Sequence, residues 1–208
     1  LYWHKKPVLN VLDLKIMAGE KVAILGRSGA GKTTLLHSLH QQALESTALC
    51  GQTLGLVPSL SVFHNIYMGQ LNKHNFLYNL VNLIHPLKSQ IEVIKPLAKN
   101  LGLNEYLFKE TGSLSGGQQQ RVALGRALFQ NKAVFLGDEP VSAVDELQSE
   151  ALLELIISRH QTVILALHNI DLALRFCDRI IGLKDGELEL DCLSEDTSAE
   201  QLRALYQG

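Results

Sequence analysis

One stretch of the sequence decides the fold: Gly26-Arg27-Ser28-Gly29-Ala30-Gly31-Lys32-Thr33-Thr34. It has the pattern G-x-x-x-x-G-K-[ST], in which glycines let successive backbone N–H groups close around an anion. The apolar run Lys21–Leu25 before it is typical of a buried strand, and leucines at 35, 36 and 39 mark one face of a following helix. A strand, a glycine-rich turn and a helix start predict a phosphate-binding loop (P-loop) for a triphosphate, because a helix N-terminus carries roughly half a positive charge.

Each position of this loop has an expected task. Lys32 would bridge the terminal phosphates through charge-assisted hydrogen bonds, and the hydroxyl of Thr33 would face Mg²⁺. The other members would contribute backbone N–H groups. The predicted nucleotide-binding set is therefore Gly26, Arg27, Ser28, Gly29, Ala30, Gly31, Lys32, Thr33 and Thr34.

The bulk properties narrow the class of protein. A net charge of −2, with acidic and basic residues mixed along the 208 residues, gives no reason to expect a nucleic-acid partner. Three cysteines without CxxC spacing suit free thiols in the reducing cytoplasm. No apolar run approaches the roughly 20 residues that cross a bilayer, so any membrane association is expected to come through a partner.

The rest of the chain predicts one α/β domain with a mostly parallel sheet. Further strands are expected over 133–136, 162–167 and 179–183, with helical patterns between them, and a strand or two over 8–16. Asp185-Gly186 predicts a hairpin into an antiparallel strand over 188–190, followed by a helix over 198–206. Residues 61–112 read as an inserted, mostly helical subdomain, which leaves 1–60 and 113–208 as the core of a single domain over 1–208.

Two carboxylates end the strand predicted over 133–136. In a P-loop protein, Asp138 would hold the metal through water, and Glu139 would act as general base on the attacking water. Strands often end in solvated acids, so it is the preceding P-loop that makes this pair informative. Glu139 and Lys32 are therefore predicted catalytic residues, and Asp138 and Thr33 predicted metal ligands.

A second anion-binding helix start follows from Leu114-Ser115-Gly116-Gly117-Gln118, directly ahead of a helix predicted over 118–129. Two such ends are redundant in a monomeric NTPase but make sense if each serves a nucleotide across a dimer interface. These five residues match the signature of ABC-type ATPases letter for letter, so the chain resembles that family. The resemblance places Ser115, Gly116, Gly117 and Gln118 opposite the P-loop of another subunit.

The resemblance implies further site residues. Asp145, in Ser142-Ala143-Val144-Asp145, would contact the opposite subunit, although Val stands where Leu is more usual. His168 matches the family's switch histidine, a third catalytic residue that contacts the terminal phosphate. Trp3 lies where the family places an aromatic that stacks on adenine; the alternative for Trp3 is an apolar anchor for the first strand.

Gln52 corresponds to the family's metal-binding and coupling glutamine, because Leu56-Val57-Pro58-Ser59-Leu60-Ser61-Val62 follows it in the expected way. The segment between Lys32 and Gln52 is shorter than is usual, which implies a reduced antiparallel β-subdomain. A helix from 32 to 44 advances roughly 18 Å. Residues 45–51 span about 23 Å if extended, so the chain can return. A plain surface-loop role for Gln52 stays open.

Taken together, the resemblance implies an ATP- and Mg²⁺-dependent importer subunit that works as a head-to-tail homodimer. Its partners would be a membrane permease and, indirectly, a substrate-binding protein, at the inner face of the cell membrane. Residues 56–62, 178–183 and 199–208 resemble ATPases of phosphonate importers. The alternatives are a soluble non-transport ABC-type ATPase, a P-loop kinase, which would leave 114–118 unexplained, and a non-hydrolysing ATP-binding regulator.

Overall fold

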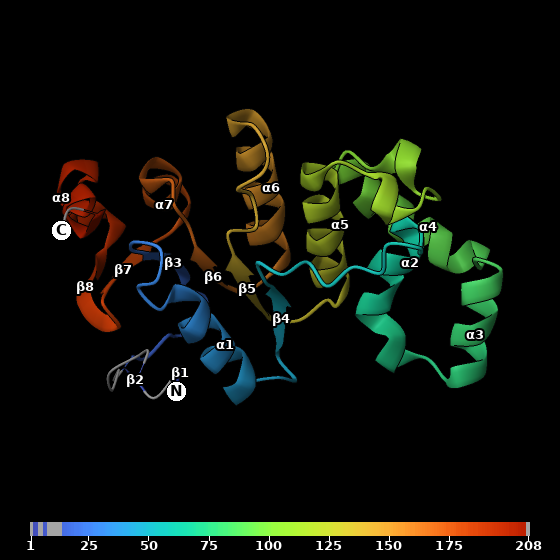
Figure 1. The fold of residues 1–208 in the computed structure, drawn as a ribbon, viewed down its shortest axis with the longest axis horizontal. Coiled ribbons are helices and arrows are strands. Elements are labelled where there is room, and N and C mark those ends of the chain that lie inside the picture. The colour runs from blue at the N-terminus through green and yellow to red at the C-terminus, as the bar shows by residue number, and fades with distance from the viewer. Residues whose placement is uncertain (1, 4–5, 8–13, 207–208) are drawn as a thin grey trace. The chain divides into compact units, whose positions relative to one another are not determined.

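The computed structural model describes residues 2–3, 6–7 and 14–206, and the chain packs as two compact units (Figure 1). The first unit comprises Leu1–Gln52, Lys132–Ser142 and Glu146–Gly208. The second comprises Thr53–Asn131 and Ala143–Asp145. Gln52 and Thr53 are therefore the point at which the chain first passes from one unit to the other.

The first unit is built on a six-stranded sheet with the order β4-β5-β6-β3-β7-β8. Five strands run parallel, and β8 is antiparallel to β7. The bounds are β3 (Lys21–Leu25), β4 (Thr47–Cys50), β5 (Val134–Asp138), β6 (Thr162–Ala166), β7 (Arg179–Lys184) and β8 (Glu187–Leu193). A separate antiparallel pair is formed by β1 (Tyr2–Trp3) and β2 (Lys6–Pro7). The predicted α/β class with a mostly parallel sheet is confirmed.

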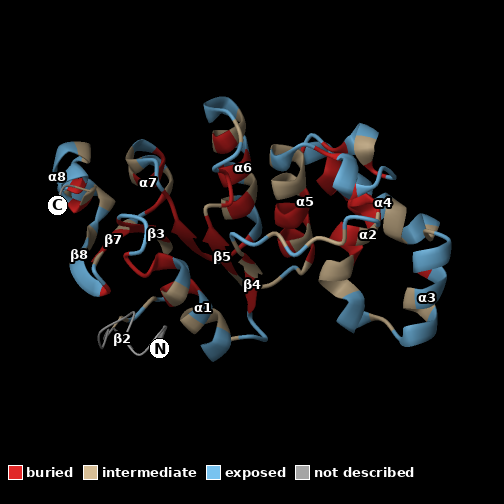
Figure 2. Cartoon of the chain, viewed as in Figure 1, coloured by how far each residue is buried: buried red, intermediate tan, exposed pale blue. Residues whose placement is uncertain are grey.

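Burial explains why these segments become strands. All five residues of β6 are buried, as are four of the five in β3 and in β5, and Figure 2 shows the inner strands of this sheet largely in the buried colour, whereas the edge strand β8 is mostly exposed. Strands covered on both faces read as continuous apolar runs, which is why the sequence located them. The Asp185-Gly186 turn has φ of 49° and 84° and joins β7 to β8, as the predicted hairpin requires.

The helices of the first unit flank this sheet. They are α1 (Lys32–Gln42), α6 (Glu146–Arg159), α7 (Ile170–Phe176), α8 (Ala199–Arg203) and the short 3₁₀ turns η4 (Ser194–Asp196) and η5 (Ala204–Tyr206). In Figure 1, α1 lies below the strands and α6 and α7 lie above them. This alternation of strand and helix places the carboxyl ends of β3, β5 and β6 on the same side of the sheet. We call this side the carboxyl-terminal edge; ligands bind there in α/β folds.

Strand β4 is the element that the sequence did not reveal. Residues 45–51 were expected only as an extended connection, but Thr47–Cys50 pairs in parallel with β5 and forms the edge of the sheet. Its four residues are too few for a pattern, and its partner lies far along the chain, with Thr47 opposite Val134. Of the strand expected over 8–16, residues 14–16 are not in a strand, and residues 8–13 lie outside the described residues.

The second unit is helical. It contains α2 (Val62–Tyr67), η1 (Met68–Lys73), α3 (Phe76–Ile84), α4 (Lys88–Asn100), η2 (Asn104–Tyr106), η3 (Thr111–Ser113) and α5 (Gly116–Phe129). The starts of α2, α3 and α5 are capped by Ser61, Asn75 and Ser115, whose side chains accept backbone N–H groups. The segment predicted over 61–112 lies inside this unit, which also takes in α5 and residues 143–145.

Gly125 inside α5 has a packing reason. A Cβ at this position would lie 2.7 Å from Leu101 Cδ1 and 3.1 Å from Ile66 Cδ1. Both neighbours are fully buried, Ile66 in α2 and Leu101 at the end of α4. The glycine therefore lets α5 approach α2 and α4 closely, which offsets the cost of about 1 kcal/mol that glycine carries in a helix interior.

Candidate active site

The P-loop leaves the end of β3 and enters α1. Gly26, Gly29 and Gly31 have φ of 146°, 85° and 103°, a region that favours glycine. A Cβ on Gly26 would lie only 2.2 Å from the carbonyl oxygen of Leu183, so this position also has no room for a side chain. Among the described residues no side chain caps the start of α1 at Gly31. The first N–H groups of α1 are thus available to an anion.

Lys32 is folded onto its own loop. Its side chain is 6% exposed, and Nζ donates to the carbonyl oxygens of Gly26 at 2.7 Å and Arg27 at 3.0 Å. Burial lowers the pKa of the Lys32 ammonium, and the charges of Glu139 and Asp138 act in the opposite direction. A buried cation next to two carboxylates is poised to exchange loop carbonyls for phosphate oxygens, which are stronger partners.

Thr33 and Asp138 meet at the start of α1 and the end of β5. The Thr33 hydroxyl donates to Oδ2 of Asp138 at 2.7 Å, and Asp138 is buried. A hydroxyl and a carboxylate side by side offer the oxygen donors that Mg²⁺ prefers, and two protein ligands suffice because Mg²⁺ keeps waters and binds substrate phosphates. The residues present therefore fit the predicted ion.

Glu139 and His168 form a hydrogen-bonded pair. Nε2 of His168 lies 2.6 Å from Oε1 of Glu139, although the two are 29 positions apart. Glu139 has φ of 54°, uncommon for a non-glycine residue, and its N–H donates to the carbonyl of Ala166 at the end of β6. The left-handed conformation of Glu139, fixed by this hydrogen bond, directs its carboxylate toward His168. Such strain is characteristic of functional positions.

His168 is set in place by the residue that follows it. Asn169 caps α7, and its Oδ1 accepts the N–H groups of Asp171 at 2.9 Å and Leu172 at 3.1 Å. The histidine side chain is 48% exposed. It can therefore reach both Glu139 and an incoming ligand.

Gln52 lies at the same edge of the sheet as the two carboxylates. Cys50 pairs with Gly137 in the parallel register, so residue 52 follows the end of β4 as Asp138 and Glu139 follow that part of β5. Gln52 is exposed. The unpredicted strand β4 is thus what returns the chain from α1 to this edge.

The second predicted phosphate-binding end lies in the helical unit. Ser115 and Gln118 form a reciprocal capping box: Oγ of Ser115 accepts the N–H of Gln118 at 3.3 Å, and Oε1 of Gln118 accepts the N–H of Ser115 at 2.9 Å. The residues 143–145 pack beside this helix start, since Ala143 N–H donates to Oε1 of Gln120 at 3.0 Å. The structure thus brings the segment of Asp145 to the signature residues.

The comparisons with known proteins settle the family. Residues 9–142 match the model of the family described as ABC transporter. The phosphonates import ATP-binding protein PhnC of Rhizobium etli is 34% identical over 231 residues, which cover 97% of this chain and 82% of the relative. The protein of the same name from Pseudomonas entomophila is 37% identical over 228 residues, covering 95% and 85%. The chain belongs to the ABC transporter family.

Solved ABC cassettes share the fold. The dimeric cassette MJ0796, in a post-hydrolysis state bound to ADP and Pi, has a TM-score of 0.73 and 28% identity, covering 90% of each chain. A nucleotide-free ABC cassette has a TM-score of 0.78 at 19% identity, covering 100% of this chain and 96% of that one, and shows the fold alone. In the described part of this ABC chain, no helix has the length and hydropathy to cross a membrane.

This ABC chain is shorter than its relatives over the matched part. The match to the Rhizobium etli protein extends over 231 residues, whereas this chain has 208 in all. That difference is consistent with the short path from Lys32 to Gln52, along which β4 follows soon after α1.

The nucleotide-binding and catalytic roles of the predicted site residues stay predictions, those of Trp3 and Asp145 included. Trp3 lies in β1, but its side chain lies outside what the structure describes. The P-loop and the signature residues belong to different compact units. Adenine stacking by Trp3 and the contact of Asp145 with another subunit stay predictions.

The sequence missed one contact of the ABC P-loop. The N–H of Gly26 donates to the hydroxyl of Tyr206 at 3.4 Å, across 180 positions of chain. For this tail the sequence predicted a helix over 198–206 and a resemblance to one subgroup, but no contact with the P-loop. No local pattern signals this contact, because it depends on how η5 is carried back to β3 and β7.

We expect the neighbouring glycines of the signature to differ sharply in their tolerance of a methyl group. A Cβ at Gly117 would lie 2.6 Å from the carbonyl oxygen of Ala143, whereas a Cβ at Gly116 would have no atom of the described residues within 4 Å. Gly117→Ala should therefore lower the free energy of unfolding by about 1–3 kcal/mol. Gly116→Ala should change it by less than about 0.5 kcal/mol in the same urea titration. Equal stability of the two variants would contradict the packing of residues 143–145 on α5.

Proposed function

We propose that this chain is the ATP-hydrolysing subunit of an ABC importer for a phosphonate or a related oxyanion. The observation that carries the hydrolytic part is the pair of Glu139 and His168, 2.6 Å apart, at the sheet edge that also holds Lys32 and Asp138. The names of the relatives support import and the class of cargo, since both quoted relatives are called phosphonates import ATP-binding proteins.

Nucleotide is held by the P-loop in this proposal. Lys32 exchanges its hydrogen bonds to the carbonyls of Gly26 and Arg27 for hydrogen bonds to the terminal phosphates. The uncapped N–H groups at the start of α1 together bind phosphate oxygens. Thr33, Gln52 and, through water, Asp138 would hold Mg²⁺. When bound, this ion offsets phosphate charge as a Lewis acid. Trp3 stacks on the adenine.

Hydrolysis follows from the placement of the acid and the histidine. Glu139 accepts a proton from the attacking water, and His168 orients Glu139 and contacts the terminal phosphate. Ser115, Gly116, Gly117 and Gln118 of a second copy complete the site in a head-to-tail homodimer, with Asp145 at the contact between copies. The hydroxyl hydrogen of Ser115 stays available to phosphate, because its oxygen serves the cap only as an acceptor.

Transport requires a partner in the membrane. We assign the loop after Gln52 and the helical unit to contact with a permease at the inner face of the membrane, and a substrate-binding protein acts through that permease. The loop is well held: Arg126 donates to the carbonyl oxygens of Leu54 and Gly55, and the buried Asn65 donates to the carbonyl of Val57 and accepts its N–H. Because these hydrogen bonds fix the loop, closure of the dimer on ATP can transmit a movement through it to the permease.

Reconstitution tests this function. The chain should be combined in liposomes with the permease of a phosphonate importer, and its ATPase rate should be measured with a phosphonate-loaded binding protein and with the empty binding protein. We expect the loaded protein to raise the rate several-fold. Full activity without any membrane protein would favour a soluble ABC-type ATPase, and nucleotide binding without turnover would favour a non-hydrolysing regulator.

A further inference from the structure

The carboxyl-terminal tail touches the P-loop at its first residue. Two groups hold Gly26: its N–H donates to the hydroxyl of Tyr206 at 3.4 Å, and its carbonyl oxygen accepts from Lys32 Nζ at 2.7 Å. Gly26 has φ of 146° and no side chain, so its own conformational preferences fix it weakly. The backbone position of Gly26 therefore depends on these two hydrogen bonds, one on each side of its Cα.

The tail is seated next to this contact by two leucines. Leu202 in α8 is fully buried, and Leu205 in η5 is 5% exposed. Leu205 lies over Gly182 of β7, where a Cβ would come within 2.8 Å of its Cδ1. Gly182 pairs with Leu25, the residue before Gly26, so the seat of Leu205 and the start of the P-loop share one stretch of the β3–β7 ladder.

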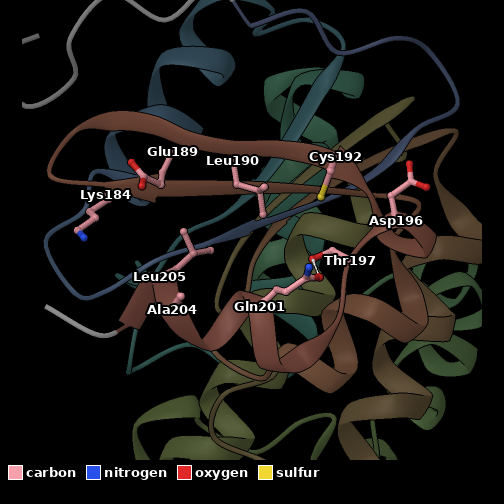
Figure 3. A pocket seen from close by; sticks show the side chains of 9 residues that line it. All are labelled: Lys184, Glu189, Leu190, Cys192, Asp196, Thr197, Gln201, Ala204 and Leu205. Carbon is pink, nitrogen blue, oxygen red and sulfur yellow. Dashed lines mark hydrogen bonds between the residues drawn. The ribbon is translucent and has the colours of Figure 1, made fainter.

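Two pockets border the tail. A cavity of about 330 Å³ separates Gln201, Ala204 and Leu205 of the tail from Leu190 and Cys192 of β8 (Figure 3). A second cavity, of about 200 Å³, lies among P-loop residues, the end of β7 and Leu205. Leu205 borders both spaces, so it lies between β8 on one side and the P-loop on the other.

We infer that Tyr206 is a positioning residue for nucleotide binding, which holds the backbone of Gly26 so that Lys32 and the loop N–H groups face the phosphates. Burial raises the pKa of the Tyr206 phenol, with the hydrogen bond from Gly26 acting against this, so the hydroxyl stays neutral and accepts the N–H. The inference rests on the proposed function only in that the P-loop binds nucleotide. It needs neither hydrolysis nor a partner.

Tyr206→Phe removes the acceptor and keeps the ring. Binding of MgADP to the isolated chain should be measured by calorimetry, which gives both the dissociation constant and the fraction of binding-competent protein. We expect the dissociation constant to rise about 3- to 10-fold, as the loss of one neutral hydrogen bond predicts. The stoichiometry should stay at the wild-type value, and the melting temperature without nucleotide should fall by no more than about 2–4 °C. Tyr106→Phe, in the helical unit, is the matched control and should leave all three quantities unchanged.

A second variant links the effect to the tail. Leu205→Ala loosens the seat of Tyr206 and should also raise the dissociation constant. Adding Tyr206→Phe to that variant should then change the constant little, because both substitutions act through Gly26. An unchanged dissociation constant in Tyr206→Phe alone would overturn the inference. So would a lower stoichiometry and melting temperature at constant affinity, which would mean a merely structural tail. Failure of the wild-type chain to bind MgADP would overturn the inference and the proposed function together.

Discussion

Glu139→Gln is expected to lower ATP turnover by about 10²- to 10⁴-fold, the usual contribution of a general base. The amide keeps the shape of the carboxylate, and its oxygen can still accept from Nε2 of His168, which lies 2.6 Å from Oε1 in the native pair. It cannot take the proton of the attacking water. Nucleotide binding should persist, because Lys32 and the N–H groups of α1 are untouched.

This variant also tests the dimer. With hydrolysis blocked, saturating MgATP should hold two copies together, which light scattering coupled to gel filtration would detect. Glu154→Gln, on the exposed side of α6, is the control and should retain wild-type turnover. If Glu139→Gln stays monomeric with saturating MgATP and the permease present, the proposal that the P-loop of one copy and the signature residues of another form one site is wrong.

Lys32→Met is expected to abolish useful nucleotide binding without harming the fold. Charge-assisted hydrogen bonds contribute about 1.5–3 kcal/mol each, so the loss of two to phosphate should weaken MgATP binding by about 10²-fold or more. The melting temperature without nucleotide should remain near the wild-type value or rise. Burial lowers the pKa of Lys32, which means that the fold penalises its charged form, and Met removes that charge at similar length.

Weaker binding of MgATP together with unchanged or higher stability of the free chain distinguishes a loss of phosphate contacts from a loss of folding. Calorimetry gives the affinity, and thermal unfolding without and with MgATP gives the stability of each state. Lys95→Met, on an exposed position of α4, is a matched control that removes one charge elsewhere. A large fall in stability without nucleotide would show that Lys32 is mainly a structural clasp for Gly26 and Arg27.

Most of the candidate active site could be predicted, because its residues lie in short sequence patterns that can be recognised locally. The glycines of the P-loop, the apolar runs of β3 and β5 and the acids that end β5 are each readable within a few residues. Parallel strands then bring their carboxyl ends together by construction. The family resemblance implied only that His168 contacts the terminal phosphate, and the hydrogen bond of 2.6 Å between His168 and Glu139 was not readable from either segment alone.

The parts that could not be predicted are those whose energy comes from distant partners. Strand β4 has four residues and gains its order from pairing with β5 and from burial of Thr47, Ala48 and Cys50. Local propensity counts Gly125 as unfavourable inside a helix, and only the close approach of Ile66 and Leu101 explains why a glycine stands there. Tertiary packing overrides local propensity in both cases.

The sequence by itself determined the chemistry of this protein: which side chains can hold phosphate, a metal ion and a water, and in which order along the chain they come. Only the tertiary structure decided how the start of the P-loop is held. Gly26 has almost no conformational preference of its own, so its placement depends on Lys32, six positions away, and on Tyr206, 180 positions away. A contact across that much chain exists only once the sheet has formed and the tail has returned to it.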